Sequence, residues 1–134
     1  MTQKDVSKPS RPPKQTYQTG LAGEQTAADW LREHRGMVCL ESRYRTPAGE
    51  IDLIMTEGKT LVFVEVKTRL KASPGEGMLS VDAKKQRRVS RAAMLYLMRK
   101  GWTNRPVRFD VVEVRRDAVL HIPNAFQPGG MFFR

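Results

Sequence analysis

The stretch "GEIDLIMTEGKTLVFVEVK", residues 49–67, decides the fold because it has the pattern of two strands joined by a tight turn. The turn is expected at 58–59, where Gly58 can take the positive φ of a type II′ hairpin turn. A two-residue loop at this place fixes the register, so that Ile54 faces Phe63 across the hairpin.

The two faces of this hairpin differ sharply in polarity. Because side chains alternate between faces, one face is expected to be wholly apolar: Ile51, Leu53, Met55, Val62, Val64 and Val66. The other face is apolar near the turn and charged at its far end. There the register places Asp52 opposite Glu65, and Glu50 opposite Lys67.

This charged quartet is costly if nothing else binds there. Two carboxylates about 4 Å apart repel by roughly 4 kcal/mol at an effective dielectric constant of about 20. A divalent cation such as Mg²⁺, which prefers oxygen ligands, would neutralise them. Two interpretations of Asp52, Glu65 and Lys67 remain open: a metal site with an adjacent lysine, or a salt-bridged cluster at the end of a sheet.

The segment upstream, "TGLAGEQTAADWLREHRG", residues 19–36, predicts a helix that ends at Gly36. Its apolar stripe consists of Leu21, Ala27, Ala28 and Leu31. Glu24 lies on or beside this stripe, where a buried acid needs a partner. It is either part of the hairpin cluster or an ordinary acid near the start of a helix, where the dipole favours it.

The remaining segments complete an alternating pattern of helices and strands. Residues 37–45 predict a strand, 68–81 a long functional or mobile loop, 82–101 a second helix, and 107–114 and 118–122 two further strands. Asp82 is expected to cap the second helix and Gly101 to end it. Its apolar stripe is Val89, Ala92, Ala93, Tyr96 and Leu97. This order predicts an α/β fold with a mixed sheet covered by helices.

Charge is the informative bulk property. The chain has 24 Lys and Arg against 14 Asp and Glu, a net charge of +10. That balance favours nucleic acid as the partner, with an anionic membrane surface second. Residues 1–18 predict a disordered basic tail, and 19–134 the folded domain. No apolar run suits a membrane span or a secretory signal, so we expect a cytoplasmic protein.

The second helix carries a basic run on its other flank: Lys84, Lys85, Arg87, Arg88 and Arg91. This run is either a solvated helix face or a contact surface for nucleic acid. Lys84 and Gln86 are also candidates to reach the charged end of the hairpin.

Several other residues point to packing rather than chemistry. Cys39 is expected to be a small buried residue in a reducing compartment. His121 is expected at the surface of a strand end, since no His or Cys is spaced to share zinc with it. The aromatic residues are scattered, so packing is favoured over base stacking for Trp30, Trp102, Phe126 and Phe132.

Five segments together resemble the YraN-like family: "GLAGEQTAADWL", "GEIDLI", "VFVEVKTR", "KKQRRVSRAAMLYL" and "RFDVVEV". The family is assigned to the restriction-endonuclease-like fold. It is similar to archaeal Holliday-junction resolvases and, more distantly, to other PD-(D/E)xK nucleases. Ile51 stands where the proline of the PD motif would be, and proline is not a metal ligand.

The resemblance implies roles at the matching positions. Asp52 and Glu65 would hold Mg²⁺ or Mn²⁺ together with the backbone carbonyl of Val66. Lys67 would orient or help deprotonate the attacking water. Glu24 would be the helical acid that completes the site in resolvase-like members.

The function implied is a metal-dependent, structure-selective DNA endonuclease that hydrolyses phosphodiester bonds. A symmetric dimer is implied as well, because a junction offers two symmetric cuts. The alternative is a non-catalytic nucleic-acid-binding module that retains the nuclease fold. A third possibility, a scaffold that binds no nucleic acid, is disfavoured by the basic charge.

Overall fold

A computed structural model of the chain describes residues 17–70 and 81–127. The elements follow in the order α1 (Tyr17–Arg35), β2 (Val38–Thr46), β3 (Gly49–Glu57), β4 (Thr60–Arg69), α2 (Ala83–Lys100), β5 (Val107–Arg115) and β6 (Val119–Ile122). Neither of these helices is long and apolar enough to cross a membrane. Most of the predicted basic tail, most of the predicted loop 68–81, and Phe132 lie outside the described residues.

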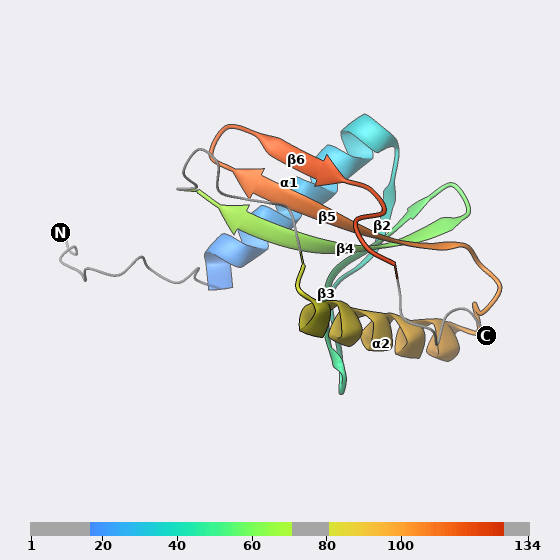
Figure 1. Ribbon diagram of the computed structural model, residues 1–134. Coiled ribbons are helices and arrows are strands. Elements are labelled where there is room, and N and C mark those ends of the chain that lie inside the picture. Colours follow the sequence, from blue (N-terminus) through green and yellow to red (C-terminus); the bar gives the residue numbers. More distant parts are fainter. Residues whose placement is uncertain (1–16, 71–80, 128–134) are drawn as a thin grey trace.

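The strands form one mixed sheet in the order β2-β3-β4-β5-β6. Strands β4 and β5 run parallel, whereas the other neighbouring pairs are antiparallel. Helix α2 lies between β4 and β5 in the chain and provides the crossover that a parallel pair requires (Figure 1). The predicted α/β fold with a mixed sheet is confirmed, and the arrangement is consistent with a restriction-endonuclease-like fold.

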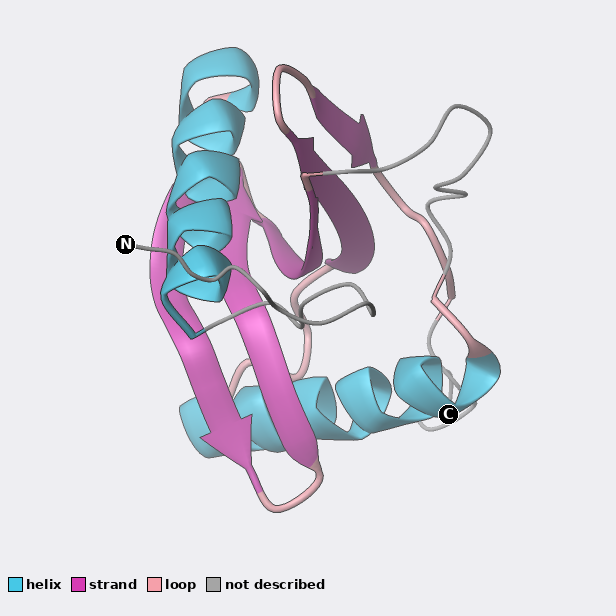
Figure 2. Cartoon of the chain, turned by 90° about the vertical axis from the view of Figure 1, so that its left-hand side faces the viewer, coloured by secondary structure: helices cyan, strands magenta, loops and turns pink. Residues whose placement is uncertain are grey.

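The two helices cover separate apolar clusters of the sheet. Helix α1 packs Ala27, Ala28 and Leu31 against a cluster that includes Leu53 and Val64. Helix α2 lies across the end of the sheet that β2 and β3 form (Figure 2), and it packs on the second of the two apolar clusters. This helix buries the whole stripe expected of it: Val89, Ala92, Ala93, Tyr96 and Leu97. Both predicted core faces of the helices are confirmed, except that Leu21 is 38% exposed.

The helix ends follow from single residues. Gly36 has φ 68°, and its N–H donates to the Arg32 carbonyl, so α1 ends where predicted. The Asp82 carboxylate accepts from the Lys85 N–H at 2.8 Å and caps α2. Gly101, at φ 72°, ends α2 in the left-handed conformation. These three predictions are confirmed.

The predicted hairpin register is confirmed from the turn as far as Leu53, which pairs with Val64, and Gly58 has the expected positive φ of 60°. The continuation is wrong: the ladder between β3 and β4 stops there, and neither Asp52–Glu65 nor Glu50–Lys67 is a ladder pair. The alternation of β3 side chains between the two faces of the sheet also breaks at this point.

The break at the end of the ladder moves Ile51 to the other side of the sheet. This residue packs in the α2 cluster and not with Leu53 in the α1 cluster, where the register placed it. The predicted apolar face is therefore correct for five of its members and wrong for Ile51. Where β3 leaves β4, the side of the strand that faces each apolar cluster changes. Asp52, which lies between Ile51 and Leu53, belongs to neither cluster.

Cys39 is exposed, so its predicted burial is wrong. It lies on β2, an edge strand of the sheet, and its neighbours Val38 and Leu40 are exposed as well. The register of β2 shifts at a bulge between Cys39 and Glu41, and a bulge, common at sheet edges, disrupts the alternation that would bury every second side chain.

The prediction that His121 lies at the surface is also wrong, because its side chain is only 3% exposed. Its Nε2 lies 2.8 Å from Asp110 Oδ2. Arg108 binds both Asp110 and Glu57, and Arg35 links Glu57 to the imidazole. This network, buried at Asp110 and His121 and partly exposed at Glu57 and the arginines, ties α1, β5, β6 and the end of β3 together. Burial acts to raise the pKa of Asp110, but hydrogen bonds from His121 and Arg108 outweigh it and hold the pKa below its ordinary value.

Two glycines of the first helix allow close approach of other elements. A Cβ at Gly23 would lie 2.0 Å from Thr68 Oγ1 of β4, a distance that no real structure tolerates. A Cβ at Gly20 would lie 2.8 Å from Arg43 Nη2, the far end of a flexible side chain. The "GLAGE" segment therefore brings α1 into contact with β4 at one glycine and makes room for an arginine at the other.

The variant Gly23→Ala is expected to lower the free energy of unfolding by about 2–3 kcal/mol, because either the Thr68 side chain or α1 must shift from its packed position to admit the methyl group. Gly20→Ala is the matched control in the same helix. It is expected to change stability by less than about 1 kcal/mol, because the guanidinium can move and alanine favours the helix. Urea unfolding of both variants measures the difference. Equal stability of the two variants would contradict the close contact at Thr68.

Candidate active site

Asp52 lies where β3 separates from β4, and it holds the two strands together by its side chain. The Val66 N–H donates to Asp52 Oδ2 at 2.8 Å, so a carboxylate takes the place of a strand carbonyl. Glu65 is the residue before Val66 and is 7% exposed. The structure thus brings these two predicted site carboxylates together without the ladder pairing that the sequence suggested.

The surroundings of Asp52 disfavour its negative charge. Burial and repulsion from Glu65 raise the pKa of Asp52 from its ordinary value of 3.8 to about 8, although the Val66 hydrogen bond acts against this. Repulsion from Glu24 adds to the rise. Without another cation, the site therefore favours one proton on Asp52 at neutral pH.

Glu24 joins this cluster from helix α1. Its Oε1 accepts from Arg43 Nε at 2.9 Å, and the residue is 8% exposed. Burial raises its pKa against the attraction of Arg43, and repulsion from Glu50 and Glu65 adds to the rise. Sequence reasoning missed Arg43. It has an unusual φ of 51° on β2, which no sequence pattern indicates.

Lys67 lies two residues beyond Glu65 on β4. Burial and repulsion from Arg69 lower the pKa of its ammonium, and attraction to Glu65 opposes this. Its partner in the ladder is Glu113 of β5. The predicted partner Glu50 instead binds Arg45 at 3.1 Å near the surface.

Glu113 is a buried acid that sequence reasoning missed. Its residue is 0% exposed, it pairs with Arg115, and its Oε1 lies 3.6 Å from Arg69 Nε. Within the described parts of the chain this Oε1 accepts no hydrogen bond. Its negative charge opposes the fall in the pKa of Lys67. A glutamate among the apolar residues of "RFDVVEV" is the only signal that could have indicated it.

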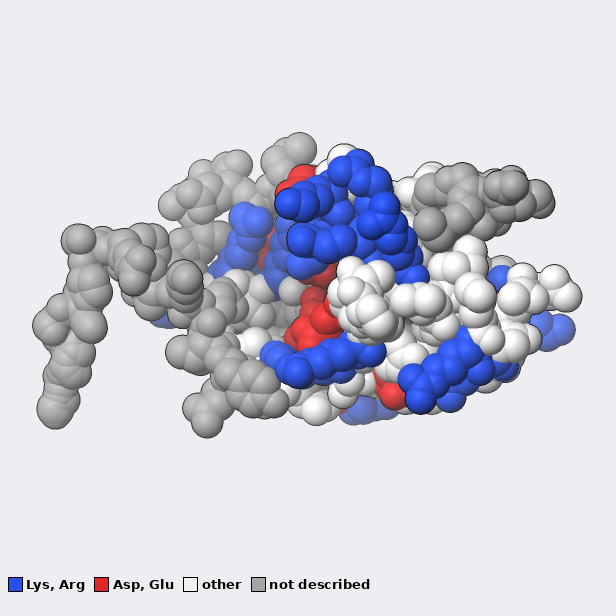
Figure 3. All heavy atoms as spheres, turned by 90° about the horizontal axis from the view of Figure 1, so that it is seen from below, with Lys and Arg blue, Asp and Glu red and all other residues white. Residues whose placement is uncertain are grey.

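The cluster is surrounded by basic residues. Figure 3, which views the face that carries α2, shows acidic side chains recessed between two groups of Lys and Arg side chains. In the first half of α2 the exposed cations are Lys84, Arg87, Arg88 and Arg91, and Arg99 and Lys100 are exposed at its end. This arrangement places positive charge around a recessed acidic centre.

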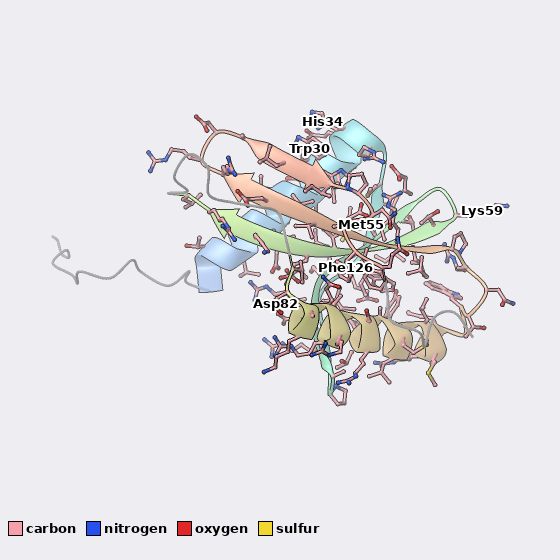
Figure 4. All side chains as sticks on the ribbon, viewed as in Figure 1. Trp30, His34, Met55, Lys59, Asp82 and Phe126 are labelled. Carbon is pink, nitrogen blue, oxygen red and sulfur yellow. The ribbon has the colours of Figure 1, made fainter. Side chains whose placement is uncertain are left out.

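Lys85, by contrast, turns into the site. Its Nζ lies 2.9 Å from Glu65 Oε2, one turn after Asp82, which Figure 4 labels at the start of α2. Of the two other residues expected to reach the site, Lys84 is exposed, and Gln86 Nε2 donates to the Val81 carbonyl. The phase of the helix relative to the sheet decides which residue reaches the acids.

The donor atoms suit a hard divalent cation. Asp52 and Glu65 supply carboxylate oxygens, and the backbone of Val66, the residue after Glu65, donates its N–H to Asp52. Among residues 17–70 and 81–127, no three His, Cys, Asp or Glu side chains are grouped to hold a metal ion. A Mg²⁺ ion is often held by one or two carboxylates and keeps several waters. The residues fit Mg²⁺ or Mn²⁺ and not zinc, which takes Cys and His.

Comparisons with known proteins place the chain in a family. The model of the Uncharacterised protein family UPF0102 matches residues 23–114. A UPF0102 protein of Geobacter metallireducens is 40% identical over 112 residues, which are 81% of this chain and 91% of that protein. A UPF0102 protein of Desulfosudis oleivorans is 45% identical over 114 residues, 84% of this chain and 92% of that protein. The predicted YraN-like membership is thereby confirmed, and the chain belongs to the UPF0102 family.

Proposed function

We propose that this protein is a metal-dependent DNA endonuclease that selects branched structures and hydrolyses phosphodiester bonds in the cytoplasm. The observation that carries the proposal is the pair of carboxylates Asp52 and Glu65 where β3 separates from β4, with Asp52 bound to the Val66 N–H at 2.8 Å and Glu65 only 7% exposed. Burial first, and repulsion from Glu65 second, raise the pKa of Asp52 to about 8. Strongly perturbed carboxylates beside lysines, inside a basic surface, are typical of functional sites. The resemblance to Holliday-junction resolvases supports the choice of DNA and of branched substrates.

Hydrolysis of a phosphodiester requires an activated water and compensation of negative charge on the phosphate. Bound by Asp52, Glu65 and the Val66 carbonyl, Mg²⁺ or Mn²⁺ would supply a Lewis acid that polarises the phosphate and acidifies water. Lys67 would orient the attacking water and offset the charge that builds on the phosphate oxygens. Glu24, fixed by Arg43, would add the third acid of the cluster. The water oxygen bonds to phosphorus and gives up one proton as the bond to the leaving sugar oxygen breaks, and that oxygen takes up one proton, so one water is added across the P–O bond.

The exposed cations of α2 would hold the sugar–phosphate backbone on either side of the scissile bond. Contacts of this kind are independent of sequence and depend steeply on salt. They suit an enzyme that recognises the shape of DNA. A symmetric dimer would place two such sites on the two strands of a junction.

A nucleic-acid-binding module without turnover is the second candidate. One observation favours it: Lys85 already neutralises Glu65 at 2.9 Å, so the cluster is partly satisfied by the protein itself. This candidate predicts salt-sensitive DNA binding that EDTA leaves unchanged.

The test is incubation of purified protein with a four-way DNA junction and with linear duplex of matching sequence, in Mg²⁺ or Mn²⁺. We expect cuts near the branch point, little cutting of the duplex, and none in EDTA. The Asp52→Asn protein prepared in parallel excludes a co-purifying nuclease. Failure to cut any DNA, with Mn²⁺ binding no different between wild type and Asp52→Asn, would rule out the proposal.

A further inference from the structure

Lys85 occupies an unusual position for a residue of a basic helix face. Its neighbours Lys84, Arg87 and Arg88 are exposed, whereas its own ammonium lies 2.9 Å from Glu65 Oε2. The Glu65 side chain is only 9% exposed, and that of Lys85 is 42% exposed. The amine therefore reaches inward from solvent to a buried carboxylate.

The Lys85 ammonium offsets the negative charge of both Glu65 and Asp52. Burial acts to lower the pKa of Lys85, but attraction to Glu65 and Asp52 raises the pKa above its ordinary value. The same amine acts to lower the pKa of Asp52. A buried carboxylate without such a partner would be costly.

The place of Lys85 on α2 makes this contact reversible. Its backbone N–H is fixed by the Asp82 cap at 2.8 Å, so the α carbon stays in place. The side chain is a flexible four-carbon stem that carries a compact charge. It can leave Glu65 for solvent or for a phosphate group without any movement of the helix.

We infer that Lys85 is a resident cation of the site, which holds Glu65 in the metal-free protein and which a divalent ion must displace. This inference rests on the proposed metal-dependent function and deepens it. Lys85 and the ion then compete for one carboxylate. Binding of the ion frees the ammonium, next to Lys84 and Arg88 on the same helix, for a DNA phosphate.

The test is calorimetric titration of Mn²⁺ into wild type and Lys85→Met at pH 8. Competition predicts that Lys85→Met binds Mn²⁺ at least about fivefold more tightly, the scale of a partly exposed ion pair. Lys85→Arg keeps the charge and is expected to bind Mn²⁺ like wild type. The matched control for net charge is Lys59→Met, an exposed lysine in the β3–β4 turn, which is expected to stay within about twofold of wild type.

Thermal unfolding provides a second measurement that does not depend on activity. In EDTA, Lys85→Met is expected to melt below wild type, because Glu65 loses its partner. Saturating Mn²⁺ should then raise the melting temperature of Lys85→Met by more than that of wild type. Lys59→Met should follow wild type in both conditions.

The outcomes separate this inference from the proposed function. Mn²⁺ binding by wild type with equal or weaker binding by Lys85→Met overturns the competition and leaves the metal site intact. Absence of Mn²⁺ binding in both proteins overturns both. Binding by Lys85→Met alone supports the competition in its strongest form.

Discussion

Replacing Asp52 by Asn is expected to abolish DNA cleavage while making the metal-free protein more stable. The loss of activity should be on the order of 10³-fold or more, the scale seen when a residue of a catalytic unit is removed. Asparagine keeps an oxygen that can accept from the Val66 N–H, as Asp52 Oδ2 does at 2.8 Å. The strands should therefore stay joined while the negative charge is lost.

The gain in stability has a defined dependence on pH. The pKa of Asp52 rises on folding from an ordinary 3.8 to about 8, so the unfolded chain releases this proton more readily than the folded one. Folding stability is lost as pH rises through this range, by up to about 1.4 kcal/mol per pH unit. Asparagine cannot ionise, so the advantage of Asp52→Asn should be absent near pH 4, grow up to pH 8 and then level off.

Urea unfolding in EDTA at pH 5, 7 and 8.5 measures this trend, with an expected gain of at least about 1 kcal/mol at the highest pH. Asp29→Asn is the control. Asp29 forms an ion pair with Arg32 on the surface of α1, so its replacement should change stability by less than about 0.5 kcal/mol and leave cleavage intact. If Asp52→Asn were the less stable protein at every pH, the two acids would not share a desolvated site.

Mn²⁺ affinity is expected to fall about tenfold for each pH unit below 8, and about 100-fold between pH 8 and pH 6. The reason is that the ion binds ionised carboxylates. In the metal-free protein the pKa of Asp52 is about 8, so below pH 8 this carboxyl is mostly protonated and must lose its proton when the ion binds. Each ion that binds at pH 6 to 7 must release about one proton.

Calorimetry in two buffers with different ionisation enthalpies counts these protons directly. The count should approach zero above pH 9, where Asp52 is already ionised. Asp52→Asn should bind weakly with little dependence on pH over the same interval. A flat affinity for wild type from pH 6 to pH 8 would show that Asp52 is not the group that yields its proton to the ion.

The sequence predicted the elements well because each is specified locally. Alternation over residues 49–67 and a glycine at the turn indicate the hairpin, and the stripe of α2 is fully buried as expected. Asp52 and Glu65 were identified as candidate site residues because they are charged side chains that interrupt the alternation of apolar residues. Local patterns of this kind survive folding because the sheet and the helices each bury one side.

The errors concern interactions between elements. The ladder stops at Leu53 because a side chain, and not a carbonyl, accepts from Val66. Lys85 rather than Lys84 reaches Glu65 because of how α2 is rotated on the sheet. Arg43 and His121 find their partners through contacts distant in the chain. No periodicity in one segment contains this information.

The hydrogen bond from Val66 to Asp52, at the point where β3 separates from β4, makes the Val66 amide proton an intrinsic reporter for NMR spectroscopy. Its proton lies against the same carboxylate that would take the ion, and the bond engages one of the two oxygens. Any event that changes the charge on that group, whether protonation or cation arrival, is transmitted to a single backbone resonance. Protonation of Asp52 and binding of a cation to it can thus be followed without a substrate or an attached label.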